Sequence, residues 1–97
     1  MSNHHCLKIL PEHFNNVNAG TKTFEIRNND RAFQKGDLVT LNEYDPDELV
    51  NHSDGFVDYN TRGKYSGRKL TFKVGDVYPI DNERVVFSLL TTKEGAE

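Results

Sequence analysis

The sequence predicts a small, mainly β (α+β) fold: a barrel of five or more mostly antiparallel strands, with one N-terminal helix capping an end. Two observations support this prediction. The chain has 97 residues, which suits one domain. Short stretches of alternating apolar and polar residues recur along it, separated by Gly, Pro, Asn and Asp. Many short strands in so small a chain favour a barrel, because closure removes edges that would pair with other chains.

The alternation and the turn residues predict six elements in order. They are a strand at 6–10 (CLKIL), a helix at 11–20 (PEHFNNVNAG), and strands at 22–27 (KTFEIR), 37–44 (DLVTLNEY), 68–80 (RKLTFKVGDVYPI) and 82–90 (NERVVFSLL). Pro11 suits the first turn of the helix, and Gly20 suits its end. Gly75 interrupts the longest strand and predicts a bulge or turn there.

In the strand predicted at 22–27, apolar and charged residues alternate. Phe24 and Ile26 occupy one face, whereas Glu25 and Arg27 occupy the other. Because the apolar face of a half-buried strand normally packs on the core, we expect the charged side chains to point away from it.

A long stretch without clear periodicity separates the strands at 37–44 and 68–80. Residues 45–63 (DPDELVNHSDGFVDYNTRG) are acidic and rich in turn residues, which predicts a mobile connection. We expect a single domain over 1–97, with its core at about 5–90 and a flexible tail at 91–97.

The composition is typical of a protein that folds in water. Apolar residues make up 35% of the chain, and no apolar run approaches the ~20 residues of a membrane span. The N-terminus lacks the pattern of a secretion signal, and a single cysteine suits a reducing compartment. We therefore expect a cytoplasmic protein that contacts no membrane. We also expect a monomer. We expect Cys6 to be a small, partly buried apolar residue.

Charge is unevenly distributed along the chain. The formal net charge of −3 excludes a uniformly basic nucleic-acid binder. Residues 43–58 are acidic without Lys or Arg, whereas residues 60–74 are basic without Asp or Glu. The basic segment, with Tyr59 and Tyr65 interleaved, has the chemistry to grip phosphates and stack a base. The alternative is a pair of solvated loop flanks that attract each other.

Three charged residues cluster where the helix ends and the next strand begins. Arg27 offers a planar fork for a phosphate or a base edge, Lys22 offers a point charge, and Glu25 can accept from an exocyclic amine. At this spacing all three can share one mouth of the barrel. The alternative is a ladder of surface ion pairs without a ligand.

Four segments carry a resemblance to a known family: LKILPEHF, GTKTFEIRNND, KGDLVTLNEYDP and YSGRKLTFKV. Together they resemble the ASCH branch of the PUA-like superfamily, most closely its short family known as domain of unknown function 3850. The match runs from His5 to about Leu90. Its most specific motif is G-x-K-T-x-E-x-R, at Gly20, Lys22, Thr23, Glu25 and Arg27. The resemblance implies a small PUA-like/ASCH β-barrel with a cleft beside the first helix.

The resemblance also implies that the cleft binds RNA or a modified nucleotide or nucleoside, without a cofactor. Combined with the charge pattern, it predicts a site at Lys8, Lys22, Glu25, Arg27, Arg31, Tyr65 and Arg68. Lys8 is the least specific of these, since it also fits a solvated lysine on an edge strand.

An enzymatic function is the first alternative. Small ASCH proteins that hydrolyse acetylated cytidine carry a threonine nucleophile three residues after a lysine, and here that position is Glu25. Thr23 lies only one residue after Lys22, so the nucleophile is not reproduced. The enzymatic alternative is therefore a small amidohydrolase acting on an acylated nucleoside, with Glu25 as general base and Lys22 as its electrostatic partner.

The histidines near the start of the chain form one further candidate site. His4, His5 and Cys6 are adjacent, and adjacent side chains on a strand point to opposite faces, so we expect no metal site there. His5 matches a histidine of the resembling family and fits either the cleft or a structural position.

A third function is a protein-interaction adaptor that uses the acidic residues of 43–58 to mimic nucleic acid.

Overall fold

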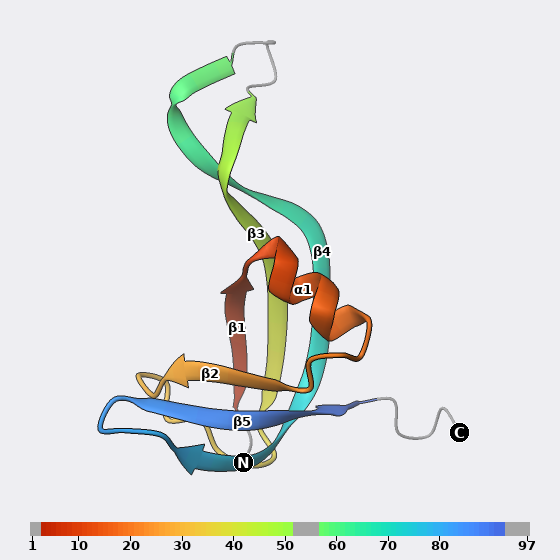
Figure 1. The fold of residues 1–97 in the computed structure, drawn as a ribbon, viewed down its shortest axis with the longest axis vertical. Helices are drawn as coiled ribbons and strands as arrows, with labels where there is room; N and C mark the ends of the chain where they lie inside the picture. The colour runs from red at the N-terminus through yellow and green to blue at the C-terminus, as the bar shows by residue number, and fades with distance from the viewer. Residues whose placement is uncertain (1–2, 52–56, 93–97) are drawn as a thin grey trace.

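The computed structural model describes residues 3–51 and 57–92, which form one sheet and one helix (Figure 1). The elements are β1 (His4–Ile9), α1 (Pro11–Asn18), β2 (Phe24–Asn28), β3 (Leu38–Asn51), β4 (Val57–Pro79) and β5 (Arg84–Thr91). All six predicted elements are therefore present, with shifted ends. Among the residues placed by the structure, no helix is long and apolar enough to cross a membrane.

The five strands form one mixed sheet in the order β1-β3-β4-β5-β2. β1 pairs with β3 in parallel, and the other neighbours pair antiparallel. The predicted barrel is wrong, because the sheet ends at β1 and β2 and no backbone ladder joins these two strands within the described ranges. β2 runs across the direction of β1 rather than alongside it, so their backbones do not align in a ladder (Figure 1). We call the gap between these two edge strands the seam.

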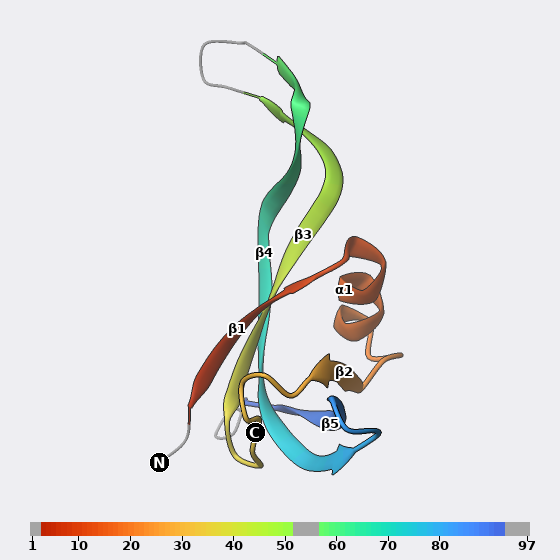
Figure 2. The same ribbon diagram turned by 90° about the vertical axis from the view of Figure 1, so that its left-hand side faces the viewer.

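The sheet is bent, so that β2 and β5 lie on the same side of β1, β3 and β4 as α1 (Figure 2). The core lies between these two groups of elements. β1 and β5 bury every second side chain, and β3 sends Val39, Leu41 and Glu43 into the core at a spacing of two, although Thr40 between them is buried as well. α1 adds Phe14 and Val17, which are 2% and 5% exposed. The predicted bulge at Gly75 is present as a shift in the β4–β5 register between Val74 and Val77.

β3 and β4 are much longer than predicted, because most of the expected connection at 45–63 belongs to them. Their outer halves pair as a two-stranded arm that projects from the body of the molecule (Figure 2). Tyr44 pairs with Tyr65, and acidic Asp45 pairs with basic Lys64. Such cross-strand pairs stabilise a hairpin, and sequence periodicity alone does not reveal them. Residues 52–56 of the predicted connection and 93–97 of the predicted tail lie outside the described residues.

β2 has the predicted alternation but the opposite orientation. Glu25 is only 3% exposed, whereas Phe24 and Ile26 are 43% and 45% exposed. The expectation that the charged residues point away from the core is therefore wrong. Glu25 can face inward because a cation lies on each side of its carboxylate, and a paired charge costs far less to bury than an isolated one.

Candidate functional site

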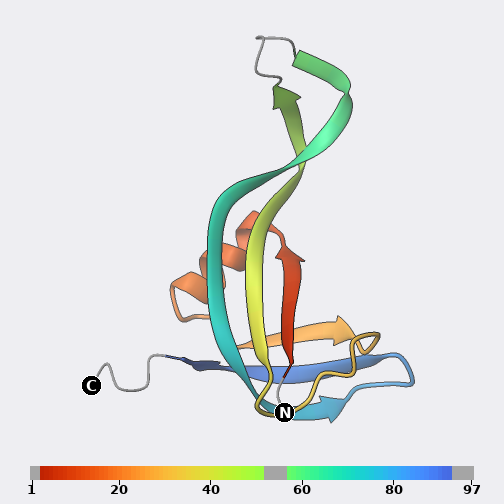
Figure 3. The ribbon, with the colours of Figure 1, turned by 180° about the vertical axis from the view of Figure 1, so that it is seen from behind.

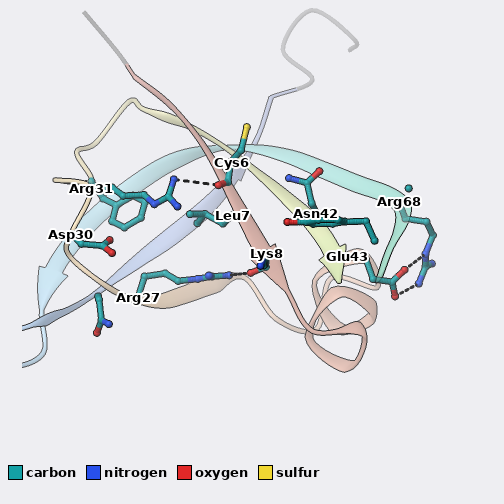
Figure 4. Close-up of a pocket in the computed structure, with 13 residues that line it drawn as sticks. Cys6, Leu7, Lys8, Arg27, Asp30, Arg31, Asn42, Glu43 and Arg68 are labelled. Carbon is teal, nitrogen blue, oxygen red and sulfur yellow. Dashed lines mark hydrogen bonds and ion pairs between the residues drawn. The ribbon is translucent and has the colours of Figure 1, made fainter. Parts of the chain in front are cut away.

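A pocket of about 670 Å³ lies at the seam, around the edge strand β1. It is lined by Cys6, Leu7, Lys8, Arg27, Asn28, Asp30, Arg31, Phe33, Asn42, Glu43, Tyr65, Gly67 and Arg68. Figure 4 shows Arg27 and Arg31 on one side of β1, and Asn42 and Arg68 on the other. The pocket therefore brings together segments that are far apart in the sequence.

Two arginines bridge the seam from the β2 side to the backbone of β1. Arg27 donates from Nη2 to the carbonyl of Lys8 at 2.8 Å, and Arg31 donates from Nη1 to the carbonyl of Cys6 at 3.3 Å. Figure 4 marks both bonds. The guanidinium groups satisfy backbone carbonyls that an adjacent strand would otherwise pair. Side chains, rather than a backbone ladder, therefore hold the two edge strands together. A backbone ladder between β1 and β2 would have left no room for the pocket.

Glu25 fixes the orientation of Arg27 from behind the pocket. Its Oε2 accepts from Nε of Arg27 at 3.1 Å, and its Oε1 accepts from Nζ of Lys22 at 3.1 Å. The Glu25 side chain is 4% exposed, against 19% for Lys22 and 25% for Arg27. Both carboxylate oxygens are thus engaged, and Arg27 is held between Glu25 and the β1 backbone.

A second carboxylate, Glu43, holds Arg68 at the opposite end of the pocket. Arg68 donates to both oxygens of Glu43, from Nε at 2.9 Å and from Nη2 at 2.8 Å, and Ser66 donates to Oε1. The Arg68 hydrogen bonds, followed by that of Ser66, lower the pKa of Glu43 from 4.5 to about 2. The same pair raises the pKa of Arg68. Arg68 also lies 4.5 Å over the ring of Phe14 and donates to Asn15, which ties β4 to α1.

An irregularity in the β3–β4 register makes this arrangement possible. Asn42 pairs with Lys69, but Tyr44 pairs with Tyr65, so residues 66–68 lie opposite Glu43 alone. Gly67 has a φ of +93°, a conformation that glycine adopts without steric cost. The extra residues let Ser66 and Arg68 turn toward the same carboxylate.

Two tyrosines form an aromatic pair on the β3 side of β1. The rings of Tyr44 and Tyr65 meet edge to face at 4.9 Å, and the Lys8 ammonium lies 4.5 Å from the Tyr44 centroid. Tyr65 remains 51% exposed. The pair therefore offers a tyrosine surface beside a cation, which suits a flat ligand with a negative group.

The lining of the pocket carries more positive than negative charge. Among the described residues it has four basic side chains, at Lys8, Arg27, Arg31 and Arg68, against two acidic ones, at Asp30 and Glu43. Glu43 is paired with Arg68, whereas Lys8 and Arg31 have no ion pair within the part of the chain that the structure describes. The pocket therefore favours an anionic ligand near Lys8 and Arg31.

Five of the seven predicted site residues line this pocket: Lys8, Arg27, Arg31, Tyr65 and Arg68. Lys22 and Glu25 do not, and act on it through Arg27. Sequence reasoning missed Glu43, although it follows buried Val39 and Leu41 at a spacing of two, a signal of an inward-facing carboxylate. Cys6, predicted to be partly buried, is exposed and lines the pocket.

His5 has a structural position. Its Nε2 lies 2.9 Å from Oδ2 of Asp37, and its ring packs against Phe33 at 4.7 Å. Burial raises the pKa of Asp37, but the hydrogen bonds from His5 and from the backbone N–H groups of Asn3 and Gln34 outweigh it, and the net pKa is lowered. No three His, Cys, Asp or Glu side chains gather into a metal-binding group within residues 3–51 and 57–92.

Comparison with known protein families gives a match over most of the chain. The profile of the family described as "Domain of unknown function (DUF3850)" matches residues 4–89, which includes the helix and all the strands except the end of β5. No curated protein matches the chain. The matched range also contains every residue of the pocket. The chain therefore belongs to the DUF3850 family.

Proposed function

We propose that this protein is a non-enzymatic binding module that holds a nucleotide unit of single-stranded RNA, or a modified nucleotide, in the seam pocket. In this proposal Arg31 and Lys8 bind the phosphate, Tyr65 stacks on the base, and Arg27 and Arg68 shape the two ends. The proposal takes the protein as a monomer that needs no cofactor, and it places the protein in the cytoplasm because a single cysteine suits a reducing compartment.

The observation that carries the proposal is the convergence on one pocket of an exposed tyrosine, Tyr65, with Lys8 and Arg31, two cations that have no ion pair among the described residues. Lys8 lies within 4.5 Å of the Tyr44 ring, and Tyr44 contacts Tyr65. Base–aromatic stacking together with a positively charged groove is the usual combination for binding single strands. The pocket volume of about 670 Å³ is also in the range of small-molecule sites.

The family relationship gives the proposal a second support. We infer that the DUF3850 family lies in the ASCH branch of the PUA-like superfamily, where many members bind RNA or modified nucleotides. A curved sheet with one helix on its inner side agrees with this inference at the level of architecture. The seam between β1 and β2 then corresponds to the cleft beside the first helix.

The amidohydrolase alternative has less support. Glu25 is 3% exposed, does not line the pocket, and uses both oxygens in ion pairs with Lys22 and Arg27. A general base needs a free oxygen within hydrogen-bond reach of the proton that it removes. The arrangement therefore favours a positioning role for Glu25 over catalysis.

Binding of cytidine 5′-monophosphate and of a short, fluorescently labelled RNA oligomer tests the proposal. Arg31→Ala should weaken oligomer binding about fourfold at ~0.15 M salt and reduce the slope of log K against log[salt] by about 0.7, because one phosphate contact is lost. Tyr65→Ala should weaken binding of both ligands about tenfold, since stacking contributes ~1–3 kcal/mol per base.

Two exposed residues away from the pocket provide matched controls. Lys35→Ala removes the same charge as Arg31→Ala, and Tyr78→Ala removes the same ring as Tyr65→Ala. Neither control should change affinity. Equal effects of test and control variants, or no binding of either ligand by the unmodified protein, would show that the pocket does not bind nucleotides.

A further inference from the structure

The face of β1, β3 and β4 that points away from the core is not covered by any described element. Figure 2 places α1, β2 and β5 on the opposite side of these strands, and Figure 3 shows the three strands side by side in front of α1. We call this surface the outer face. Its side chains are His4, Cys6 and Lys8 from β1, Leu38, Thr40, Asn42 and Tyr44 from β3, and Tyr65, Lys69, Thr71 and Lys73 from β4.

None of the outer-face residues just named is acidic, although the protein as a whole carries a net charge of −3. Lys8 pairs with Asn42, and Asn42 pairs with Lys69, so two lysines flank an amide in one row across the sheet. Neighbouring strands lie ~4.8 Å apart, which separates the backbones of these two lysines by ~10 Å. Lys73 lies four residues along β4 from Lys69, about 13 Å farther down the strand.

Hydrogen-bonded side chains hold the middle of the outer face rigid. His4 lies 2.7 Å from the Thr40 hydroxyl, and Thr40 lies 2.8 Å from the Thr71 hydroxyl. This chain of contacts crosses all three strands. The lysines therefore project from a fixed polar surface on which the exposed Thr71 also offers a hydroxyl group for a sugar or a phosphate, whereas the Thr40 hydroxyl is buried.

The outer face is continuous with the seam pocket. Cys6, Lys8, Asn42 and Tyr65 belong to both, and all line the pocket. A chain that places one nucleotide in the pocket therefore has a basic surface beside it along which to continue. A free mononucleotide is too short to reach Lys69 and Lys73.

We propose that the outer face binds the sugar–phosphate backbone of single-stranded RNA that extends from the pocket, with Lys69 and Lys73 contacting phosphates. This inference rests on the proposed function and specifies its ligand as a polynucleotide rather than a free nucleotide. The charge complementarity between an acid-free lysine surface and a polyanion carries it.

The test compares Lys69→Ala/Lys73→Ala with the unmodified protein, using cytidine 5′-monophosphate and the RNA oligomer in parallel. The double variant should bind the oligomer about tenfold more weakly at ~0.15 M salt and should reduce the salt slope by about 1.4, because two phosphate contacts are lost. Its affinity for the mononucleotide should be unchanged. Lys35→Ala/Arg84→Ala is the control, since it removes two exposed basic residues that are each paired with an acid outside the outer face.

Amide shifts in NMR spectra separate the two proposals. Shifts at Arg27 and Arg31 with both ligands, and at Thr71 and Lys73 with the oligomer alone, support both. If the mononucleotide binds but the double variant leaves oligomer affinity and salt slope unchanged, the outer face is not the RNA surface while the pocket proposal stands. Binding of acidic proteins in place of RNA, or no binding of either ligand, overturns both.

Discussion

Two buried carboxylates, Glu25 and Glu43, lie at opposite ends of the seam pocket, and their surroundings differ. Glu25 is flanked by Lys22 and Arg27, both mostly buried, and Arg27 continues to the β1 backbone. Glu43 is held by Arg68, whose side chain is 51% exposed. Glu25 therefore joins two strands that share no ladder, whereas Glu43 joins β3 and β4, which are already paired.

This difference indicates separate roles for the two carboxylates. Where backbone hydrogen bonds already join two strands and the cation is half exposed, as for Arg68, an ion pair is less important to the fold and can shape a ligand site. Where backbone hydrogen bonds between two strands are missing, side-chain ion pairs and hydrogen bonds must hold the strands together instead. We therefore expect changes at Glu25 and Arg27 to affect stability first, and changes at Glu43 and Arg68 to affect mainly the pocket.

The largest effect should come from Arg27→Ala. This change removes one of the two cations from a buried carboxylate and leaves the Lys8 carbonyl without its donor. Loss of one partner of a buried pair typically costs a few kcal/mol, so the free energy of unfolding should fall by about 3 kcal/mol. Urea denaturation measures it, and an unchanged m-value would show that the variant differs in stability and not in the surface exposed on unfolding.

Arg84→Ala is the control for this change. Arg84 pairs with Asp81 on the surface, where its side chain is 52% exposed, and exposed pairs of this kind contribute little. If both variants had the same stability, Arg27 would have no special role at the seam, and the contrast between the two carboxylates would fail.

A direct comparison of Glu25→Gln with Glu43→Gln gives the next largest effect. Each change removes one negative charge and keeps the shape of the side chain. Glu25→Gln leaves two mostly buried cations without a counter-charge and should lower the free energy of unfolding by about 2 kcal/mol. Glu43→Gln should lower it less, because water reaches the half-exposed Arg68. Thermal unfolding of both variants at the same pH measures the difference, and the reverse order would contradict the assigned roles.

The sequence predicted the elements of this fold better than the way they meet. Alternation at Phe24 and Ile26 identified β2, but the same alternation is compatible with either face being buried. The choice depended on Lys22 and Arg27 reaching Glu25, a tertiary contact that hydrophobicity does not encode. The same limit explains the barrel, since periodicity does not tell whether the edges of a sheet will pair.

The pocket was partly predictable for a similar reason. Five residues were predicted from their chemistry and from the family resemblance, and all five line the pocket: Lys8, Arg27, Arg31, Tyr65 and Arg68. They meet there because the fold brings β1, β2 with the segment that follows it, and β4 close together. Glu43 was missed because its sequence neighbours suggested a solvated acidic segment. Only the bulge that turns Arg68 and Ser66 toward it makes it part of the site.

The smallest expected effect is the pH dependence that Glu43 contributes to stability. Its pKa is about 2 in the folded protein against an ordinary value of 4.5, so as the pH falls the unfolded chain binds a proton at this carboxyl first. The contribution of Glu43 is therefore complete above its unfolded pKa and is lost as the pH falls through about 2. Stability measured across this window should decline less steeply in Glu43→Gln than in the unmodified protein. Some decline should remain in the variant, because the pKa of Asp37 is also lowered by folding. If stability declined with falling pH equally steeply in both proteins, Arg68 would not hold Glu43 ionised in solution. The Glu43–Arg68 pair would then not order this end of the pocket.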